Sequence, residues 1–417
     1  MKLSWFGRLA LALFASLALG LGMSACGGGT IAYLWVLGTS LNQAGNTSGE
    51  IGAFKVDDYT GNLTQVEHQP FGSQGANPVT LLVKSGGRFL YVLNQGTLPS
   101  SCTNPATCNT KWTGSGIAYF SVGGDGTLSY QQSYQSQGYD PVWMQFDSTN
   151  SYLYVLDKYS ASGDGNGSIT VFSIDPTTGR LTLVLNTQSV PPNSPAPTYW
   201  EVGANPLMMR SAGSCLFTVN SADQSIFPYS QGAGGQLVNV TTGKIATSAN
   251  TISSINGNGS YIILTDTGSN TIIPYSIGSG CTLSLALGGV TPNQPGTSNP
   301  VYSFIDSSGK YLYILNQSTT STTVTQPFSS ITGFLIQSGA SLANSYNTGS
   351  PYQVDAGPVC MVEDPTNKYM YVSAHNSGQI TGKLFDPTTG ELSALSRGST
   401  FSATSLATCL TISGAVD

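Results

Sequence analysis

The sequence predicts an all-β fold built from one repeated unit. Three observations support this: an aromatic-rich segment recurs seven times, alternating apolar residues and Gly-containing turns surround each copy, and no stretch after residue 30 keeps a helical period. Hydrophobic residues make up 40% of the 417 residues, enough for a large buried core. The chain is therefore expected to form one large repetitive body.

The aromatic-rich segment marks the second strand of each unit, and its copies recur about every 56 residues. A third and a fourth strand follow, as in Gly167–Phe172 and the turn Asp175–Leu181, which returns as Asp386–Leu392. Seven units of four antiparallel strands predict a seven-bladed β-propeller. The seven second strands are predicted at Ala32–Val36, Phe89–Val92, Tyr152–Val155, Cys215–Thr218, Tyr261–Leu264, Tyr311–Ile314 and Tyr369–Val372.

The two ends of the propeller are expected to meet in one blade. The chain enters at a second strand, and its last apolar segment, Leu406–Ile412, matches the first-strand segment Pro358–Val362. The C-terminal strand should therefore complete blade one and close the ring, which removes a free sheet edge. Residues 31–417 are thus predicted to be a single seven-bladed β-propeller.

Residues 1–25 have the pattern of a bacterial lipoprotein signal peptide. Lys2 and Arg8 flank the start of an apolar run, Leu9–Leu21, that is too short to span a bilayer as a helix. The Met-Ser-Ala-Cys sequence that follows resembles a lipobox, so Cys26 is the predicted lipidation site. A plain signal peptide with an incidental cysteine is the alternative.

Residues 26–30 would then be the lipidated cysteine and a short Gly tether. Second strands begin on the face that carries the turns between strands 1 and 2 and between strands 3 and 4 of a blade. Cys26 lies four residues before such a strand, a reach of about 14 Å, so this face should lie against the membrane. The face with the 2-3 loops should look outward. The signal peptide and the lipobox predict an exported protein anchored in the cell envelope. Because Gly27, and not Asp, follows Cys26, the outer membrane is favoured.

The composition argues against a nucleic-acid partner. Only 14 residues are Lys or Arg, the formal net charge is -6, and no basic run occurs. Phosphate binding needs clustered positive charge.

Six further cysteines permit 15 pairings, which the repeat register narrows. Cys102 and Cys108 bracket a long loop between strands 2 and 3 of a blade. Cys360 and Cys409 lie on the inner strands of neighbouring blades, and Cys215 and Cys281 lie at strand starts on the same face of neighbouring blades. An oxidising compartment would favour all three disulfides, whereas no Cys-x-x-Cys spacing supports a metal cluster. The pairs indicated are Cys102 with Cys108, Cys215 with Cys281, and Cys360 with Cys409.

Polar residues end the second strands beside the predicted mouth of the channel. They either cap strands by binding adjacent turn backbone or line a polar ligand pocket. His375, Asp157 and Asp266 are weak catalytic candidates, since no nucleophile elbow or other catalytic set is present. The predicted ligand-binding residues are Asn94, Asp157, Asn220, Asp266, Asn316 and His375.

Other ionisable residues are expected to be structural. His68 should be an exposed linker residue, and Gly163–Ser168 resembles a calcium loop only loosely, because no bidentate acid follows. No metal and no cofactor are therefore expected. Five charged residues each stand five positions before a second strand, which predicts turns on the membrane-facing side: Lys84, Asp147, Arg210, Asp306 and Asp364.

The repeat resembles the seven-bladed lactonase propeller family, which includes bacterial propeller-type 6-phosphogluconolactonases. Gly75–Pro78, Gly203–Pro206 and Gly309–Asn316 carry the resemblance. It implies a catalytic His and Arg at inner-strand starts and a Glu after a second-strand Asn. The corresponding segments here carry none of these residues: they read Gly357–Cys360, Asp140–Trp143 and Asn316-Gln317.

The sequence therefore favours a binding or assembly module whose outward mouth takes a neutral polar ligand, such as a glycan, or a protein. Its other partner would be the membrane, through the lipid anchor. The alternatives are a lactonase with a rebuilt site near His375 and a structural component of the envelope.

Overall fold

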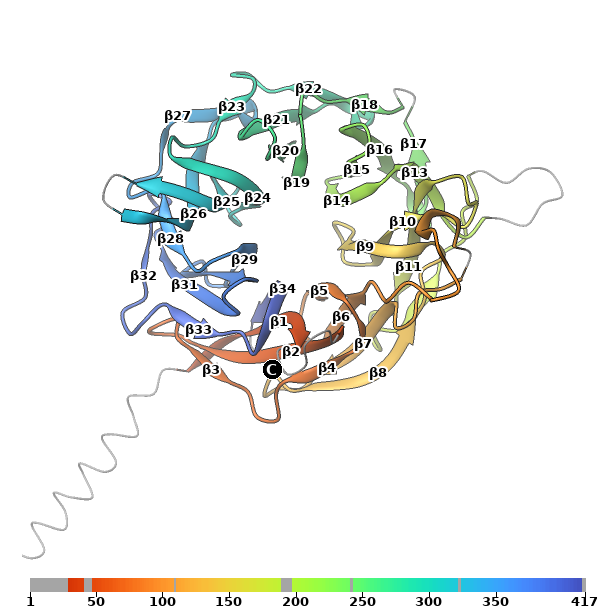
Figure 1. Ribbon diagram of the computed structural model, residues 1–417, viewed down its shortest axis with the longest axis horizontal. Coiled ribbons are helices and arrows are strands. Elements are labelled where there is room, and N and C mark those ends of the chain that lie inside the picture. Colours follow the sequence, from red (N-terminus) through yellow and green to blue (C-terminus); the bar gives the residue numbers. More distant parts are fainter. Residues whose placement is uncertain are drawn as a thin grey trace, which may run out of the picture.

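Seven antiparallel sheets stand around a central opening in the computed structural model (Figure 1). The predicted seven-bladed β-propeller is therefore confirmed. The predicted signal peptide and Cys26 lie outside the described residues. The structure describes residues 29–40, 47–108, 110–188, 197–240, 243–321 and 324–414.

The two inner strands of each blade pair along most of their length. The first strands surround the central channel, and the second strands carry the aromatic repeat and are almost completely buried. From blade one to blade seven, the first strands are β34 (Ser405–Gly414), β5 (Pro78–Val83), β9 (Tyr139–Phe146), β14 (Pro206–Ala212), β19 (Ile252–Gly257), β24 (Thr297–Ile305) and β29 (Pro358–Glu363). The second strands are β1 (Thr30–Ser40), β6 (Phe89–Asn94), β10 (Tyr152–Tyr159), β15 (Cys215–Asn220), β20 (Tyr261–Asp266), β25 (Tyr311–Ser321) and β30 (Tyr369–Ala374).

The outer edge of most blades differs from the expected single fourth strand. In six blades the third strand pairs with two short outer strands, one near each of its ends, whereas blade two has one continuous outer strand. The third strands are β2 (Ser48–Asp57), β7 (Gly116–Val122), β11 (Asn166–Ile174), β16 (Ser225–Gln231), β21 (Thr271–Ile277), β26 (Val324–Ile336) and β31 (Gln379–Phe385). The outer strands are β3 (Leu63–Gln65), β4 (Phe71–Ala76), β8 (Leu128–Tyr134), β12 (Leu181–Leu183), β13 (Trp200–Ala204), β17 (Leu237–Asn239), β18 (Ile245–Ala246), β22 (Leu283–Leu285), β23 (Thr291–Pro292), β27 (Leu342–Tyr346), β28 (Tyr352–Val354), β32 (Leu392–Ala394) and β33 (Thr400–Ser402).

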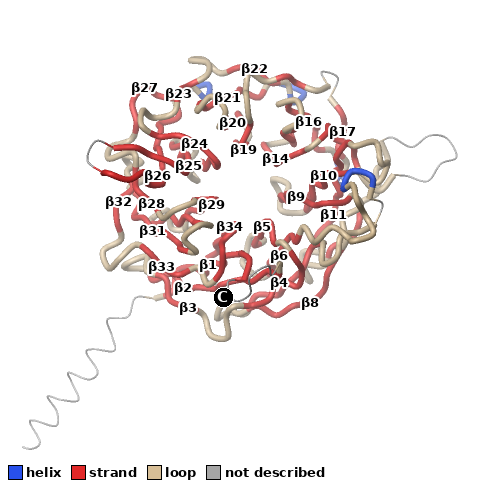
Figure 2. Tube along the Cα trace, in the orientation of Figure 1, coloured by secondary structure: helices blue, strands red, loops and turns tan. Residues whose placement is uncertain are grey.

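Helices are minor in the described chain (Figure 2). None of them has the length and apolar content that crossing a membrane would require. They are four 3-10 turns of three residues each, η1 (Pro105–Thr107), η2 (Ala233–Gly235), η3 (Ser279–Cys281) and η4 (Ser338–Ala340).

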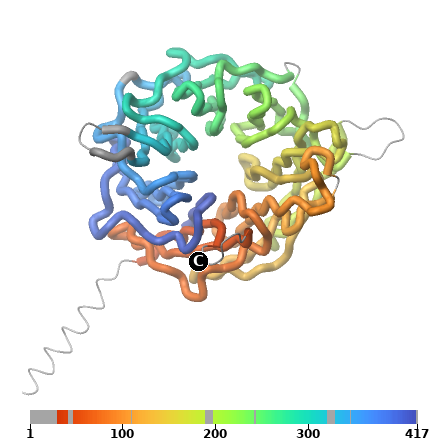
Figure 3. Tube along the Cα trace, in the orientation of Figure 1, coloured from red at the N-terminus to blue at the C-terminus, as the bar shows by residue number. Residues whose placement is uncertain are grey.

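The ring closes as the sequence predicted. The chain passes round the blades in order, and its first and last described strands meet in blade one (Figure 3). There β34 pairs with β1, for example at Val36 with Leu410. The first and the last described strands thus belong to one sheet. Because β34 follows directly on blade seven, this pairing leaves no gap between blade seven and blade one.

Aromatic side chains tie several of the blades to the next one. The hydroxyl of Tyr371, on the second strand of blade seven, donates to the carbonyl of Gly61 in the 3-4 turn of blade one, at 2.6 Å. Tyr313 donates to Gly390 in the same way, at 2.8 Å. Gly61 has φ +68°, and a Cβ there would stand 2.5 Å from the ring of Tyr369. The turn glycines of the repeat therefore make room for the aromatic rings of the neighbouring blade.

Candidate functional site

Five of the six predicted ligand-binding residues occupy one equivalent position, opposite the residue at which the first strand enters its blade. Each is at most 2% exposed, so none of them lines an open pocket. These five residues are Asn94, Asp157, Asn220, Asp266 and Asn316.

Asp157 binds the segment that leads into strand β9. Its carboxylate accepts hydrogen bonds from Ser136 Oγ at 2.6 Å, from the Gly138 amide at 3.2 Å and from Thr170 Oγ1 at 3.3 Å. Burial raises the pKa of Asp157 to about 7, although these hydrogen bonds and Lys111 oppose the shift. Asp157 is 0% exposed, and its carboxyl group holds this loop.

Three of the other four residues make the same kind of contact, whereas Asn220 donates to Ser225 Oγ, in the third strand of its own blade, at 3.3 Å. Asn94 donates to the Ser73 carbonyl at 3.0 Å, and Asn316 accepts from the side chain of Asn293 at 2.7 Å. Asp266 accepts the amide N–H of Asn250 at 2.8 Å. Burial alone would raise the pKa of Asp266, but hydrogen bonds from Ser269 and from backbone amides lower it overall. The pKa values of the two candidate acids are thus shifted in opposite directions although the residues share a position.

His375 lies one residue beyond this position. Strand pairing places Ala374, not His375, opposite Pro358, so Ala374 is the equivalent of Asn94 in blade seven. Successive residues of a strand face opposite sides, and a shift of one residue changes the environment of the side chain. His375 is partly exposed, and its Nδ1 lies 3.0 Å from the carbonyl oxygen of Ala407.

The position of His375 is polar and at least partly exposed in all seven blades. These seven side chains lie on the face of the 2-3 loops, beside the entrances of the first strands, and we call them the mouth ring. Five of the seven are neutral hydroxyl or amide side chains. The mouth ring consists of Thr39, Gln95, Lys158, Ser221, Thr267, Gln317 and His375.

Contacts of the mouth ring reach the first-strand entrances. Gln95 Nε2 donates to Asp140 of the next blade at 2.5 Å, and Gln317 Oε1 accepts from Asn299 at 2.6 Å. Asp140 is 3% exposed and burial raises its pKa, which Gln95 opposes. The ring is thus held in place, while its outer surface stays open to solvent.

Lys111, from the 2-3 loop of blade two, lies close to Asp157 without touching it. Its Nζ donates to the carbonyls of Ser136, at 2.6 Å, and Gly138, and stands 4.6 Å from the ring centre of Tyr139. Burial lowers the pKa of Lys111, and Asp157 partly opposes this. The segment from Ser136 to Gly138 therefore accepts hydrogen bonds from Lys111 through its carbonyls and donates hydrogen bonds to Asp157.

Arg210 is not the turn residue that the sequence predicted. The 1-2 hairpin of blade four is short: Ala212 pairs with Cys215, whereas in blade three Asp147 stands beside Tyr152. Counting five residues back from the second strand therefore gives a turn in blade three and a residue inside β14 in blade four. Arg210 lines the central cavity of the ring.

Three of the other four charged residues do hold turns. Each carboxylate accepts backbone N–H groups of its own hairpin, for example Asp306 from Tyr311 at 2.7 Å. Asp147 and Asp364 bind their turns in the same way. Lys84 lies in the corresponding turn, where its amide donates to the carbonyl of Phe89 at 2.8 Å.

His68 and the loosely calcium-like loop have structural surroundings. His68 is exposed between β3 and β4, with φ +61°. Asp164 accepts from the amide and the side chain of Asn166, at 2.9 and 2.8 Å, so its oxygens are used within the hairpin. Across the described residues, no three His, Cys, Asp or Glu side chains gather as metal ligands would.

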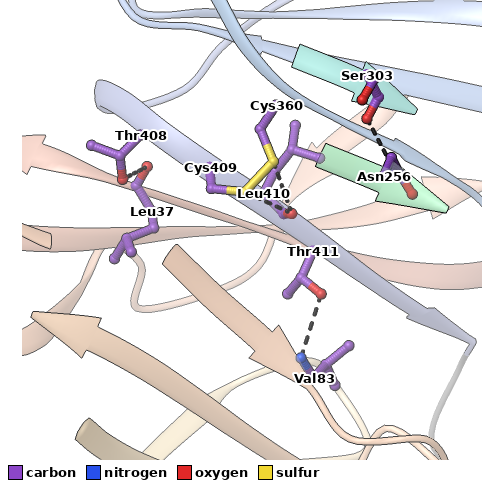
Figure 4. The surroundings of a disulfide bond; sticks show 9 residues. All are labelled: Leu37, Val83, Asn256, Ser303, Cys360, Thr408, Cys409, Leu410 and Thr411. Carbon is purple, nitrogen blue, oxygen red and sulfur yellow. Dashed lines mark hydrogen bonds between the residues drawn. A yellow bond between two sulfur atoms is a disulfide. The ribbon is translucent and has the colours of Figure 1, made fainter. Parts of the chain in front are cut away.

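The three cysteine pairs are those that the sequence indicated. Cys360 and Cys409 join first strands β29 and β34 across the closure of the ring, and Thr411 Oγ1 nearby accepts from the amide of Val83 in blade two, at 3.4 Å (Figure 4). The channel wall is thus linked covalently from blade seven to blade one and by a hydrogen bond from blade one to blade two.

The geometry defines a closed propeller with a polar mouth, and comparisons with known proteins agree with this class. A model of the family described as Lactonase, 7-bladed beta-propeller, matches residues 103–212. The resemblance to lactonase propellers is therefore confirmed. No curated protein matches the chain.

Solved structures with the same fold extend over nearly the whole chain. The periplasmic gluconolactonase PpgL of Pseudomonas aeruginosa is 14% identical with a TM-score of 0.66, over 92% of this chain and 99% of that protein. A Bacteroides fragilis protein, whose assignment as a 6-phosphogluconolactonase is provisional, is 17% identical with a TM-score of 0.66, over 91% and 98%. Identities this low show a common fold and carry no catalytic residue across.

Proposed function

We propose that this protein is an exported, lipid-anchored propeller that binds a neutral polar ligand, such as a glycan, at its outward mouth. The mouth ring carries the proposal, because it offers one partly exposed polar side chain per blade and five of the seven are neutral. Hydroxyl and amide groups can both donate and accept hydrogen bonds, which suits sugar hydroxyls. The acids nearby, Asp140 and Asp157, are buried and already hydrogen-bonded.

The anchor would set the orientation of this surface. The first described strand starts at Thr30, at the end of blade one that carries the 1-2 and 3-4 turns, while the mouth ring lies at the opposite end. A lipid on Cys26 would therefore leave the mouth facing away from the membrane. Replacing Cys26 by Ser should move the protein from the membrane fraction to the soluble fraction, and an unchanged distribution would contradict the anchor.

Binding can be tested with the chain from residue 27 onward, which contains the whole closed ring. Neutral oligosaccharides are titrated calorimetrically into wild type, Gln317→Ala and Ser221→Ala. The matched control is Gln131→Ala, which removes an exposed amide from outer strand β8. Loss of binding in the two mouth variants alone supports the proposal. Equal loss in Gln131→Ala, or binding to protein partners with no response to any sugar, would contradict it.

A lactonase is the second candidate. The structures named above include a gluconolactonase, and Lys111 and Asp157 have pKa values shifted toward neutral by burial. The test is hydrolysis of sugar and aliphatic lactones by wild type and His375→Ala. Turnover above the spontaneous rate that His375→Ala abolishes would replace the binding proposal by an active site at the mouth.

A further inference from the structure

We infer that the central channel holds a second site, specific for a small oxyanion, at Arg210. The site is separate from the mouth ring and does not depend on the function proposed for it. A cavity of about 190 Å³ lies inside the ring, and residues from all seven first strands line it. Among the described residues that line it, Arg210 is the only charged one.

The cavity has one layer with an equivalent residue from every blade. Strand pairing aligns Arg210 with Gln145 of blade three and Asn256 of blade five, because each stands opposite the third residue of a second-strand repeat. A cation is thus flanked by two amide side chains. The complete layer is Leu82, Gln145, Arg210, Asn256, Phe304, Val362 and Thr411.

Only one edge of the Arg210 guanidinium is used by the protein. Nε and Nη2 both donate to the carbonyl of Gly257 in blade five, at 3.0 and 2.8 Å. Within the described part of the chain, Nη1 has no hydrogen-bond partner. The Nη1–Nη2 edge therefore remains for a ligand, and this fork matches two oxygens of a carboxylate or a phosphate.

The surroundings make a bound anion favourable. Burial lowers the pKa of Arg210, but a guanidinium stays protonated in proteins, so its charge needs compensation. In the part of the chain that the structure describes, no acid lines the cavity with it. Tyr302 and Trp143 line the same space, and the indole Nε1 of Trp143 has no hydrogen-bond partner among the described residues. These groups could donate to the remaining oxygens of an oxyanion.

The test is thermal unfolding of the chain from residue 27 in acetate, gluconate or phosphate, each compared with chloride at equal ionic strength. A ligand that binds only the folded state raises the unfolding midpoint with its concentration. We expect wild type to respond to a carboxylate or to phosphate, and the stronger of the two identifies the source of the oxyanion. A wild-type protein that responds to none of them beyond chloride overturns the inference.

Two variants and one control locate the site. Arg210→Met should weaken the response at least tenfold, and Arg210→Lys, which keeps the charge but loses the fork, should weaken it less. Arg180→Met is the control, because it removes the same charge from an exposed turn. If Arg210→Met does not fold, the response of Arg210→Lys and the comparison of salts with the wild type still test whether Arg210 binds an oxyanion. Equal affinity in wild type and both Arg210 variants, or equal loss in Arg180→Met, refutes the site.

Discussion

Asp157 gives the most direct test of the electrostatics of blade three. Its pKa rises from an ordinary value of 3.8 to about 7 on folding, because the carboxyl is fully buried. Between these two values the folded protein keeps a proton that the unfolded chain releases. The free energy of unfolding should therefore fall as pH rises from about 4 to about 7, and the contribution of Asp157 should be fully present only below this range.

The size of the effect follows from the shift. Each pKa unit corresponds to about 1.4 kcal/mol, so a shift of about three units gives about 4 kcal/mol. Asp157→Asn removes the titration and keeps a neutral side chain that other blades already use at this position, as in Asn94. Relative to wild type, Asp157→Asn should gain about 4 kcal/mol between pH 4 and pH 8.

Urea unfolding followed by tryptophan fluorescence, with disulfides intact, measures this difference across the pH range. The control is Asp175→Asn, an exposed carboxylate whose pKa hydrogen bonds from Thr178 lower, so its removal should not reproduce the trend. Parallel pH profiles of wild type and Asp157→Asn would show that Asp157 is charged in the folded protein, and would refute the reasoning.

Three further changes test the ring itself. Replacing Cys360 and Cys409 together by Ser should lower the free energy of unfolding by about 2 to 4 kcal/mol, because the disulfide closes a long loop, and denaturant titration under oxidising conditions measures it. Gly179→Ala should destabilise the protein more than Gly86→Ala in thermal unfolding. Both glycines have positive φ, but only at Gly179 would the added Cβ meet an aromatic ring, 2.7 Å away. Equal effects of the two substitutions would contradict the packing argument. Tyr371→Phe should cost about 1 to 2 kcal/mol in the same assay, because the carbonyl of the neighbouring blade loses its donor, and no cost would mean that this bond does not hold the blades together.

The repeat predicted the fold well, because each blade must bury the same aromatic second strand. The pattern also gave the ring closure at Leu406–Ile412 and the three cysteine pairs, since both depend on equivalence between blades. The split outer strands were missed. In six blades the third strand pairs with two short outer strands. An outer strand of two or three residues, such as Thr291–Pro292, is too short for alternation of apolar and polar residues to show in the sequence.

The site was harder to predict because it depends on register to a single residue. Matching His375 to Asn94 misplaced it by one position, and Ala374 has no polar side chain that would have shown the error. Arg210 was misplaced because hairpin length varies between blades, which residue counting does not detect. The polarity shared by residues such as Gln95 and Gln317 was visible in the sequence, but their common exposure follows only from strand pairing.

The pairing of β1 with β34 also has a consequence for the order of assembly. The sheet of blade one combines the earliest and the latest segments of the propeller, so it cannot be completed before synthesis has reached Ser405–Gly414. Until then the inner edge of β1 has no partner, and an open arc of blades would present that edge to other chains. A chain that stops short of this strand would therefore be prone to aggregate, and Ser405–Gly414 decides whether the preceding blades become a stable ring.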